Sequence, residues 1–281
     1  MKELVLHERT DRLVNRLEGN LPHALVVEGA SGSGVRTVSE HLAKSMGSPI
    51  FMVEAKKSQN GSFVTDLNEG NIIIDDIRLL YEQTRSKQPG NHVYILDTGE
   101  RTMTNAAQNA FLKLLEEPRD GLFFIIATHH YDKLLPTITS RSQRLSLLPV
   151  SEAQTRELIS SLAVLDPVQQ ARLAFVGQGL PALVKRLLDD ASIYEARVAI
   201  MSDAKTMIGG QAYEKAVVAH KYKDRRADTL TLIDDMNHQI SVILKKNPDQ
   251  SLIALIDRLL IARDSISNGG NVRLQLLNSV V

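Results

Sequence analysis

The chain has 281 residues and a mass of 31.1 kDa, and 43% of its residues are hydrophobic, which is enough to bury at least one core. Basic and acidic residues balance in each half, with 17 against 18 in residues 1–150 and 16 against 15 in residues 151–281, so net charge does not indicate a nucleic-acid-binding domain. The absence of cysteine excludes disulfides, thiol nucleophiles and thiolate metal sites. Because no apolar run approaches the ~18 residues of a membrane span and no signal peptide is recognisable, we expect a cytoplasmic protein.

Residues 1–148 alternate between short apolar strands and helices. Strands are expected at 24–29, 49–54, 91–97 and 122–128, and helices at 35–46, 74–87 and 105–117. The strand segments are continuously apolar, without the alternation of a half-exposed strand. This pattern predicts an α/β domain whose parallel sheet is buried on both faces.

After Pro149 the pattern becomes helical. One helix is expected from Ser151 to residue 162, and two more begin at Pro167 and Pro181. A break at Gly209 and Gly210 precedes helices at 211–221, 226–245, 250–266 and 272–280. We therefore divide the chain into an α/β core (1–148), a small helical module (149–208) and an all-helical C-terminal unit (209–281).

The segment GASGSGVRT, residues 29–37, lies between a strand and a helix, where a phosphate-binding loop belongs. The usual spacing places a lysine at position 35, which is Val35 here; Arg36 follows, and Thr37 lies one place beyond the expected magnesium-binding hydroxyl. Three interpretations stay open: a turn kept for structure, nucleotide binding in which Arg36 reaches a phosphate, and competent hydrolysis.

Asp97 ends an apolar strand, which is the usual place of a magnesium-holding carboxylate in such a fold, although a turn residue is equally consistent. Thr98 occupies the position at which a second carboxylate would commonly activate water, and we expect Glu100 to face elsewhere. The loop and this strand end together define the candidate nucleotide-site residues, which are Gly29, Gly32, Gly34, Arg36, Thr37 and Asp97.

Other conspicuous groups have ordinary explanations. His129 and His130 are adjacent and lack a third ligand, so a loop pair is favoured and no metal site is predicted. Lys185 and Arg186 are expected on a solvated helix face, with nucleotide sensing as the alternative. The basic run KYKDRR, residues 221–226, fits a charged helix end better than a DNA contact.

Three segments together resemble the AAA+ clamp-loader family of bacterial DNA polymerase III, and within it the delta prime branch. They are LPHALVVEGASGSG, DTGERTMTNAAQNAFLKLLEEP and IIATHHYDKLLPTITSRSQRLSL. The resemblance implies a RecA-like AAA+ parallel-sheet core, a helical lid and a C-terminal helical collar that joins subunits. Arg141 lies in a Ser-Arg-Ser turn that matches the family's Ser-Arg-Cys box, which implies an arginine finger acting in trans on ATP bound to a neighbouring subunit.

The same resemblance implies that this chain is an ATPase-inactive, delta prime-like subunit with a vestigial nucleotide site. We expect no cofactor, with ATP and magnesium as the alternative, and no zinc, because the four-cysteine module of many relatives is missing from residues 56–71. The implied partners are a gamma/tau ATPase subunit, the delta subunit, the sliding clamp and, through the complex, primer–template DNA; no membrane is involved. The alternatives are an ATP-hydrolysing gamma/tau-like subunit that uses Arg36 and Glu100, or an AAA+-derived DNA-binding scaffold outside clamp loading.

Overall fold

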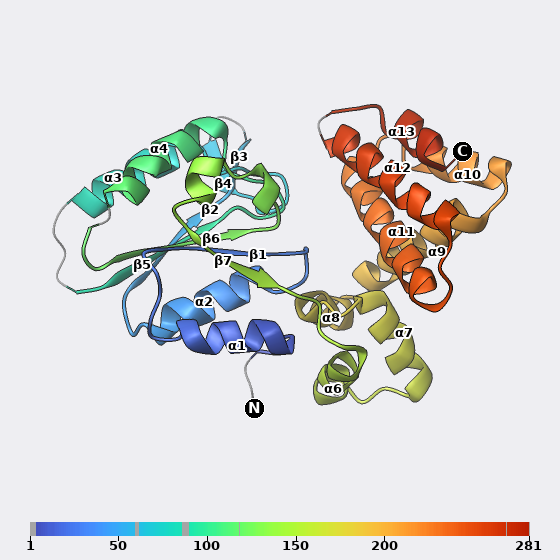
Figure 1. The fold of residues 1–281 in the computed structure, drawn as a ribbon, viewed down its shortest axis with the longest axis horizontal. Helices are drawn as coiled ribbons and strands as arrows, with labels where there is room; N and C mark the ends of the chain where they lie inside the picture. The colour runs from blue at the N-terminus through green and yellow to red at the C-terminus, as the bar shows by residue number, and fades with distance from the viewer. Residues whose placement is uncertain (1–3, 60–61, 86–89, 118, 268, 281) are drawn as a thin grey trace. The chain divides into compact units, whose positions relative to one another are not determined.

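The computed structural model describes residues 4–59, 62–85, 90–117, 119–267 and 269–280 (Figure 1). The chain divides into two compact units between Leu187 and Leu188. The domain boundaries expected at 148/149 and 208/209 stay predictions. Within the described ranges, no helix is both long and apolar enough to cross a membrane. The cytoplasmic location stays a prediction as well.

The first unit is built on a five-stranded parallel sheet, which confirms the predicted α/β class. The spatial order of its strands is β2 (Ile50–Glu54), β5 (His92–Asp97), β6 (Leu122–Thr128), β1 (Ala24–Gly29) and β7 (Gln143–Leu147). Four strands were predicted, whereas β7 was not. Only Leu145 and Leu147 are buried in this short edge strand, so its apolar signal is weak.

Successive residues of each central strand point to opposite faces, and both faces are covered. Ala24 and Val26 of β1 pack in the core on the side of α3 (Ile74–Arg85), α4 (Asn105–Glu116) and α5 (Pro136–Thr139). Leu25 and Val27 pack in a second core with α1 (Glu8–Leu17) and α2 (Val35–Ser45). Figure 1 shows these two helices on the face of the sheet opposite α3 and α4. A strand buried on both sides has no polar face, which explains the continuous apolar runs of the sequence.

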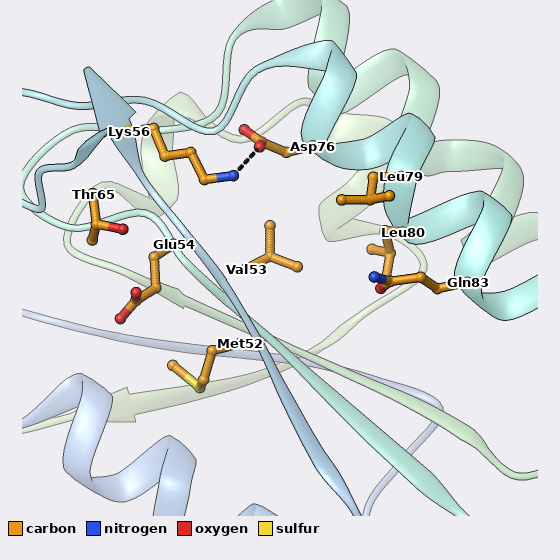
Figure 2. Close-up of a pocket in the computed structure, with 9 residues that line it drawn as sticks. All are labelled: Met52, Val53, Glu54, Lys56, Thr65, Asp76, Leu79, Leu80 and Gln83. Carbon is orange, nitrogen blue, oxygen red and sulfur yellow. Dashed lines mark hydrogen bonds and ion pairs between the residues drawn. The ribbon is translucent and has the colours of Figure 1, made fainter. Parts of the chain in front are cut away.

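Two short strands, β3 (Lys56–Gln59) and β4 (Ser62–Thr65), pair antiparallel in a small hairpin outside the main sheet. The sequence predicted no element here and only the absence of a zinc module. A cavity of about 130 Å³ lies between this hairpin, the edge strand β2 and α3, and Lys56 crosses it to form an ion pair with Asp76 at 2.7 Å (Figure 2).

Three helices follow the sheet within the first unit, namely α6 (Glu152–Leu162), α7 (Pro167–Gly177) and α8 (Pro181–Asp189), the last of which ends just beyond its boundary. Their starts confirm the predicted signals. Ser151 caps α6 in a capping box with Gln154, and Pro167 and Pro181 each occupy the first position of their helix. The N-terminus of α8 meets the glycine-rich loop, because the amides of Ala182 and Leu183 donate to the Gly32 carbonyl at 2.9 and 3.1 Å.

The second unit is helical and has its own core. It contains α9 (Ala191–Gly209), α10 (Ala212–Lys221), α11 (Arg226–Lys246), α12 (Gln250–Ser267) and α13 (Val272–Val280). The last four match the predicted helices closely. An ion pair between Arg197 of α9 and the fully buried Asp235 of α11 lies within this unit.

Candidate functional site

The carboxyl ends of β1, β5 and β6 meet at the point where the strand order of the sheet reverses, which is where open α/β sheets bind ligands. The glycine-rich loop leaves β1 there and leads into α2, with Gly34 as N-cap residue at φ 94°. Val35, at the position of the usual lysine, is buried in the core, and Thr37 is solvent-exposed. Neither residue places a charged or hydroxyl group where a phosphate would be held.

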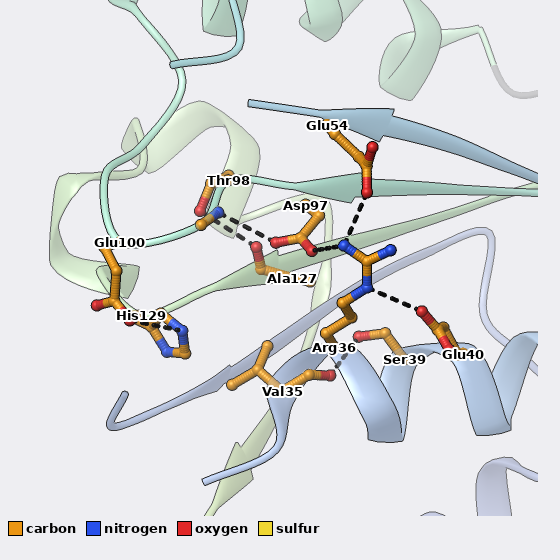
Figure 3. A network of polar contacts seen from close by, with 11 residues as sticks. Val35, Arg36, Ser39, Glu40, Glu54, Asp97, Thr98, Glu100, Ala127 and His129 are labelled. Atoms are coloured by element: carbon orange, nitrogen blue, oxygen red, sulfur yellow. Dashed lines mark hydrogen bonds and ion pairs between the residues drawn. The ribbon is translucent and has the colours of Figure 1, made fainter. Parts of the chain in front are cut away.

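Arg36 makes the central contacts of this site. Its Nε donates to Glu40 at 2.9 Å, and its Nη1 donates to Glu54 at 2.7 Å and to Asp97 at 3.2 Å (Figure 3). Burial alone would lower the pKa of Arg36, but the hydrogen bonds to Glu54 and Glu40 outweigh it and raise that pKa. The guanidinium therefore stays charged and turns toward carboxylates.

Asp97 keeps only 8% of its side chain exposed at the end of β5. Burial raises its pKa, against the opposing effects of the Gly99 amide, which donates to Oδ1 at 3.0 Å, and of Arg36. Glu54 is the register partner of Asp97 on the neighbouring strand, so both carboxylates meet one guanidinium. Glu40 and Glu54 were not among the predicted site residues, although Glu40 follows Arg36 by one helical turn and Glu54 ends the next strand.

Glu100 lies beside the loop, and the expectation that it faces elsewhere was wrong. It accepts a hydrogen bond from Ser31, and its Oε1 lies 4.0 Å from Nε2 of His129 (Figure 3). The turn at Gly99, where φ is 59°, redirects the chain after Asp97 and brings Glu100 back over the loop.

The two histidines point to different acceptors. His129 donates from Nδ1 to the Gly29 carbonyl at 2.8 Å, whereas His130 donates from Nε2 to the Glu100 carbonyl at 3.0 Å. Thr128 is buried and accepts a hydrogen bond from the amide of His130 at 3.1 Å, which is a local capping contact.

A cavity of about 190 Å³ lies among these groups. Its walls include Arg36, Asp97, Glu100, His129 and, from α8, Arg186. The sequence analysis placed Arg186 on a solvated helix face; its side chain is exposed but also lines this cavity. Because α8 begins at Pro181 and packs on Gly32 through its first turn, Arg186 lies next to the glycine-rich loop. The sequence shows the start of the helix but not this packing.

Arg141 lies two residues after the short helix α5. Its Nη1 donates to the Thr137 carbonyl at 3.2 Å, and its Nη2 lies 3.1 Å from Oε1 of Glu116. The side chain is 40% exposed.

The basic run 221–226 has internal partners. Lys221 pairs with Asp203 at 2.6 Å, Arg225 pairs with Asp228 at 2.8 Å, and Arg226 donates to the Ile266 carbonyl. The hydroxyl of Tyr222 donates to Asp203 at 2.8 Å, and burial together with that bond raises the pKa of Tyr222. These contacts agree with the structural interpretation of the run.

Comparison with known proteins first defines the class. The fold is that of RecA-like AAA+ proteins with a C-terminal helical region. A RuvB variant of Thermotoga maritima aligns with a TM-score of 0.52 at 15% identity, over 80% of this chain and 83% of that one. A gamma subunit-related protein of DNA polymerase III from the same organism aligns with a TM-score of 0.50 at 22% identity, over 97% of each chain.

The family model described as DNA polymerase III, delta subunit, matches residues 7–151, which is more than half of the chain. The chain belongs to this family and is a delta prime-like protein of the bacterial clamp-loader type. Sequence relatives include the delta' subunits of Haemophilus influenzae, 27% identical over 64% of this chain and 59% of the relative, and of Pseudomonas aeruginosa, 27% identical over 67% and 62%. The gamma/tau subunit of Mycoplasma pneumoniae is 26% identical over 69% of this chain and 30% of its own length. The chain thus spans less than two thirds of the length of these relatives.

Proposed function

We propose that this chain is a clamp-loader subunit that does not hydrolyse ATP itself and supplies Arg141 in trans to a neighbouring ATPase subunit. Its partners would be a gamma/tau-type ATPase subunit, a delta subunit and, through the assembly, the sliding clamp and primed DNA. The observation that carries the inactive role is the contact between Arg36 and Asp97.

In phosphate-loop ATPases, a loop hydroxyl and a strand-end aspartate together hold the magnesium ion. Here Arg36 stands at the hydroxyl position, and its guanidinium lies 3.2 Å from the aspartate that would bind the metal. A fixed cation on that carboxylate repels a second cation, so these residues do not fit magnesium.

The part of the site that would face a bound phosphate also does not favour nucleotide binding. Val35 offers no charge to a β- or γ-phosphate, and the cavity of about 190 Å³ is smaller than the roughly 300–1,000 Å³ of ordinary ligand pockets. The loop then serves as a strand-to-helix turn on which α8 rests.

Arg141 suits action in trans because its guanidinium is exposed while its backbone is anchored. Ile138 of α5 is fully buried, and the amide of Leu135 donates at 2.7 Å to the buried Gln108 of α4. A guanidinium held in this way would stabilise charge on a neighbour's γ-phosphoryl group, an effect of roughly 10³–10⁵ in rate for well-studied GTPases.

The decisive experiment is the DNA-stimulated ATPase rate of the loader reassembled from the same source with this subunit carrying Arg141→Ala. We expect a loss of turnover of at least about tenfold with assembly preserved, because no other group replaces the charge. Arg78→Ala is the matched control, since Arg78 is also an exposed arginine in a single ion pair, with Asp75 at 3.0 Å. An unchanged rate for Arg141→Ala would reject the role in trans.

An ATP-hydrolysing role has one observation in its favour, which is the position of Glu100 on the wall of the cavity. This alternative predicts saturable binding of labelled ATP with magnesium and turnover that Asp97→Ala abolishes. We expect no binding at high micromolar nucleotide, for the reasons given for Arg36 and Val35. Saturable binding with turnover would make this chain the ATPase.

A DNA-binding scaffold outside clamp loading has weaker support. The most basic run of the chain is engaged in contacts within the second unit, and the net charge is zero.

A further inference from the structure

Arg141 forms an ion pair with Glu116 of its own chain, and this pair suggests a further role for the acid. Glu116 is the last residue of α4, and its carboxylate lies 3.1 Å from Nη2 of Arg141. We propose that Glu116 is a positioning residue, a latch that holds the Arg141 guanidinium against α4 until a phosphate oxyanion of the neighbouring subunit takes its place. This inference rests on the proposed function of Arg141.

The position of Glu116 is unfavourable for α4 by itself. The C-terminus of a helix carries partial negative charge, which favours cations and disfavours carboxylates, and Glu117 follows directly as the C-cap residue. The Arg141 guanidinium offsets this local charge, so the pair explains why an acid stands there. The pair links α4 to the segment after α5 at a place where both side chains remain about half exposed.

The same helix fixes the base of the arginine. Gln108, two turns before Glu116 on α4, donates to the Lys133 carbonyl at 3.1 Å and accepts from the Leu135 amide at 2.7 Å. The backbone that carries Arg141 is thus tied to α4 through the buried Gln108, whereas its side chain contacts α4, among the described residues, through the exposed Glu116. The side chain can change partner without any movement of the backbone.

Exposed ion pairs contribute little, so the latch is easily released. A phosphoryl group with several charged oxygens is the stronger acceptor for a guanidinium, and a carboxylate left beside it would repel it. Release of Arg141 from Glu116 therefore costs little free energy. Arg141 then leaves Glu116 only when the neighbouring subunit holds a nucleotide whose phosphate can take its place.

The test compares binding of this subunit to the loader's ATPase subunit with ADP and aluminium fluoride, which mimic the transferring phosphoryl group, and without nucleotide. Glu116→Gln is expected to tighten binding two- to fivefold with the mimic, equivalent to about 0.4–1 kcal/mol at 1.4 kcal/mol per tenfold, and to leave binding unchanged without it. Glu117→Gln, which removes the same charge one residue away, should behave as wild type in both conditions. The effect of Glu116→Gln should vanish in an Arg141→Ala background.

A second measurement needs no partner. The guanidinium ¹⁵N resonances of Arg141 in the isolated chain should report increased mobility in Glu116→Gln and no change in Glu117→Gln. Wild-type mobility in Glu116→Gln, or weaker binding of that variant to the mimic-loaded neighbour, would overturn the latch. If Arg141→Ala itself changes neither ATPase rate nor binding, the proposed function fails; if it does and Glu116→Gln matches wild type, the latch alone fails.

Discussion

At the scale of single residues, the side chain of Arg36 decides what the glycine-rich loop can bind. Its charge is placed among Glu40, Glu54 and Asp97 by two neighbouring strands and the first turn of α2. Because Asp97 is nearly buried, the ionised carboxylate depends on this cation for compensation. The contact therefore has a stability role that can be measured without nucleotide.

Replacement of Arg36 by methionine is expected to lower the free energy of unfolding by roughly 1–3 kcal/mol near neutral pH, because a buried carboxylate loses its partner. Burial already holds the pKa of Asp97 above its ordinary value, and loss of Arg36 raises it further. When the folded-state pKa of Asp97 lies above the unfolded one, the folded state binds more protons, so the free energy of unfolding falls as pH rises. The stability that the variant loses relative to wild type therefore grows as pH rises from about 4 through the folded-state pKa. Urea unfolding at about pH 4 and about pH 7.5 measures this difference; an equal deficit at both values would contradict it.

Some residue-level features depend on a single position and can be read from the sequence alone. Val35 in place of lysine and Thr98 in place of a second acid are visible in the chain itself. Glu54 and Glu100 could not be assigned, because their roles depend on strand register and on the turn at Gly99.

At the scale of elements, the contact between the loop and α8 joins that helix to the carboxyl end of the sheet. Gly32 adopts φ 88°, and a Cβ on it would lie 2.7 Å from Cβ of Leu183. Its carbonyl accepts two amides from the first turn of α8. The loop and α8 are thus joined by direct backbone hydrogen bonds.

Substitution Gly32→Ala is expected to destabilise the first unit and to free the amides of Ala182 and Leu183 for hydrogen exchange. Gly34→Ala is the matched control, because Gly34 has a similar φ of 94° but open space around the added methyl group. The clash with Leu183 should make Gly32→Ala the more destabilising variant by roughly 1–3 kcal/mol. An equal loss of stability and equal hydrogen exchange in the two variants would show that the packing of α8 on the loop does not contribute to the stability of the first unit.

The sequence predicted the strongly apolar strands and the capped helices but neither α1 nor β7. The only buried residues of α1 in the described structure are Thr10, Val14 and Leu17, a sparse stripe, and β7 alternates over five residues. Both elements pack against the edge of the sheet, and the sequence of each segment alone does not show this packing.

At the scale of the whole molecule, the chain has two units with separate cores. The first unit holds the loop, Asp97 and Arg141, while the second holds a helical core with the buried pair of Arg197 and Asp235. Buried pairs of this kind are costly to break on one side only, because the remaining charge lies uncompensated.

Substitution Arg197→Met is expected to cost about 3–5 kcal/mol in the second unit and to leave the first nearly unchanged. Native-state hydrogen exchange, followed segment by segment, should show lost protection in α9 and α11 and retained protection in β1 and β5. The double substitution Arg197→Met with Asp235→Leu should recover most of the loss, since no buried charge remains. Lost protection throughout the sheet would contradict the independence of the two cores.

The α/β class, four of the five strands of the main sheet, the helical C-terminal half, the missing lysine and the family resemblance are all recognisable in the sequence. These depend on local periodicity, on helix caps and on residue identity at single positions, which neighbouring residues in the chain settle. Packing of the folded chain is what brings Arg36 to three carboxylates, Glu100 back over the loop, α8 onto Gly32 and Glu116 to Arg141. Each of these contacts joins groups on different elements, and their energies depend on register, burial and distance, which exist only once the sheet and its helices have packed.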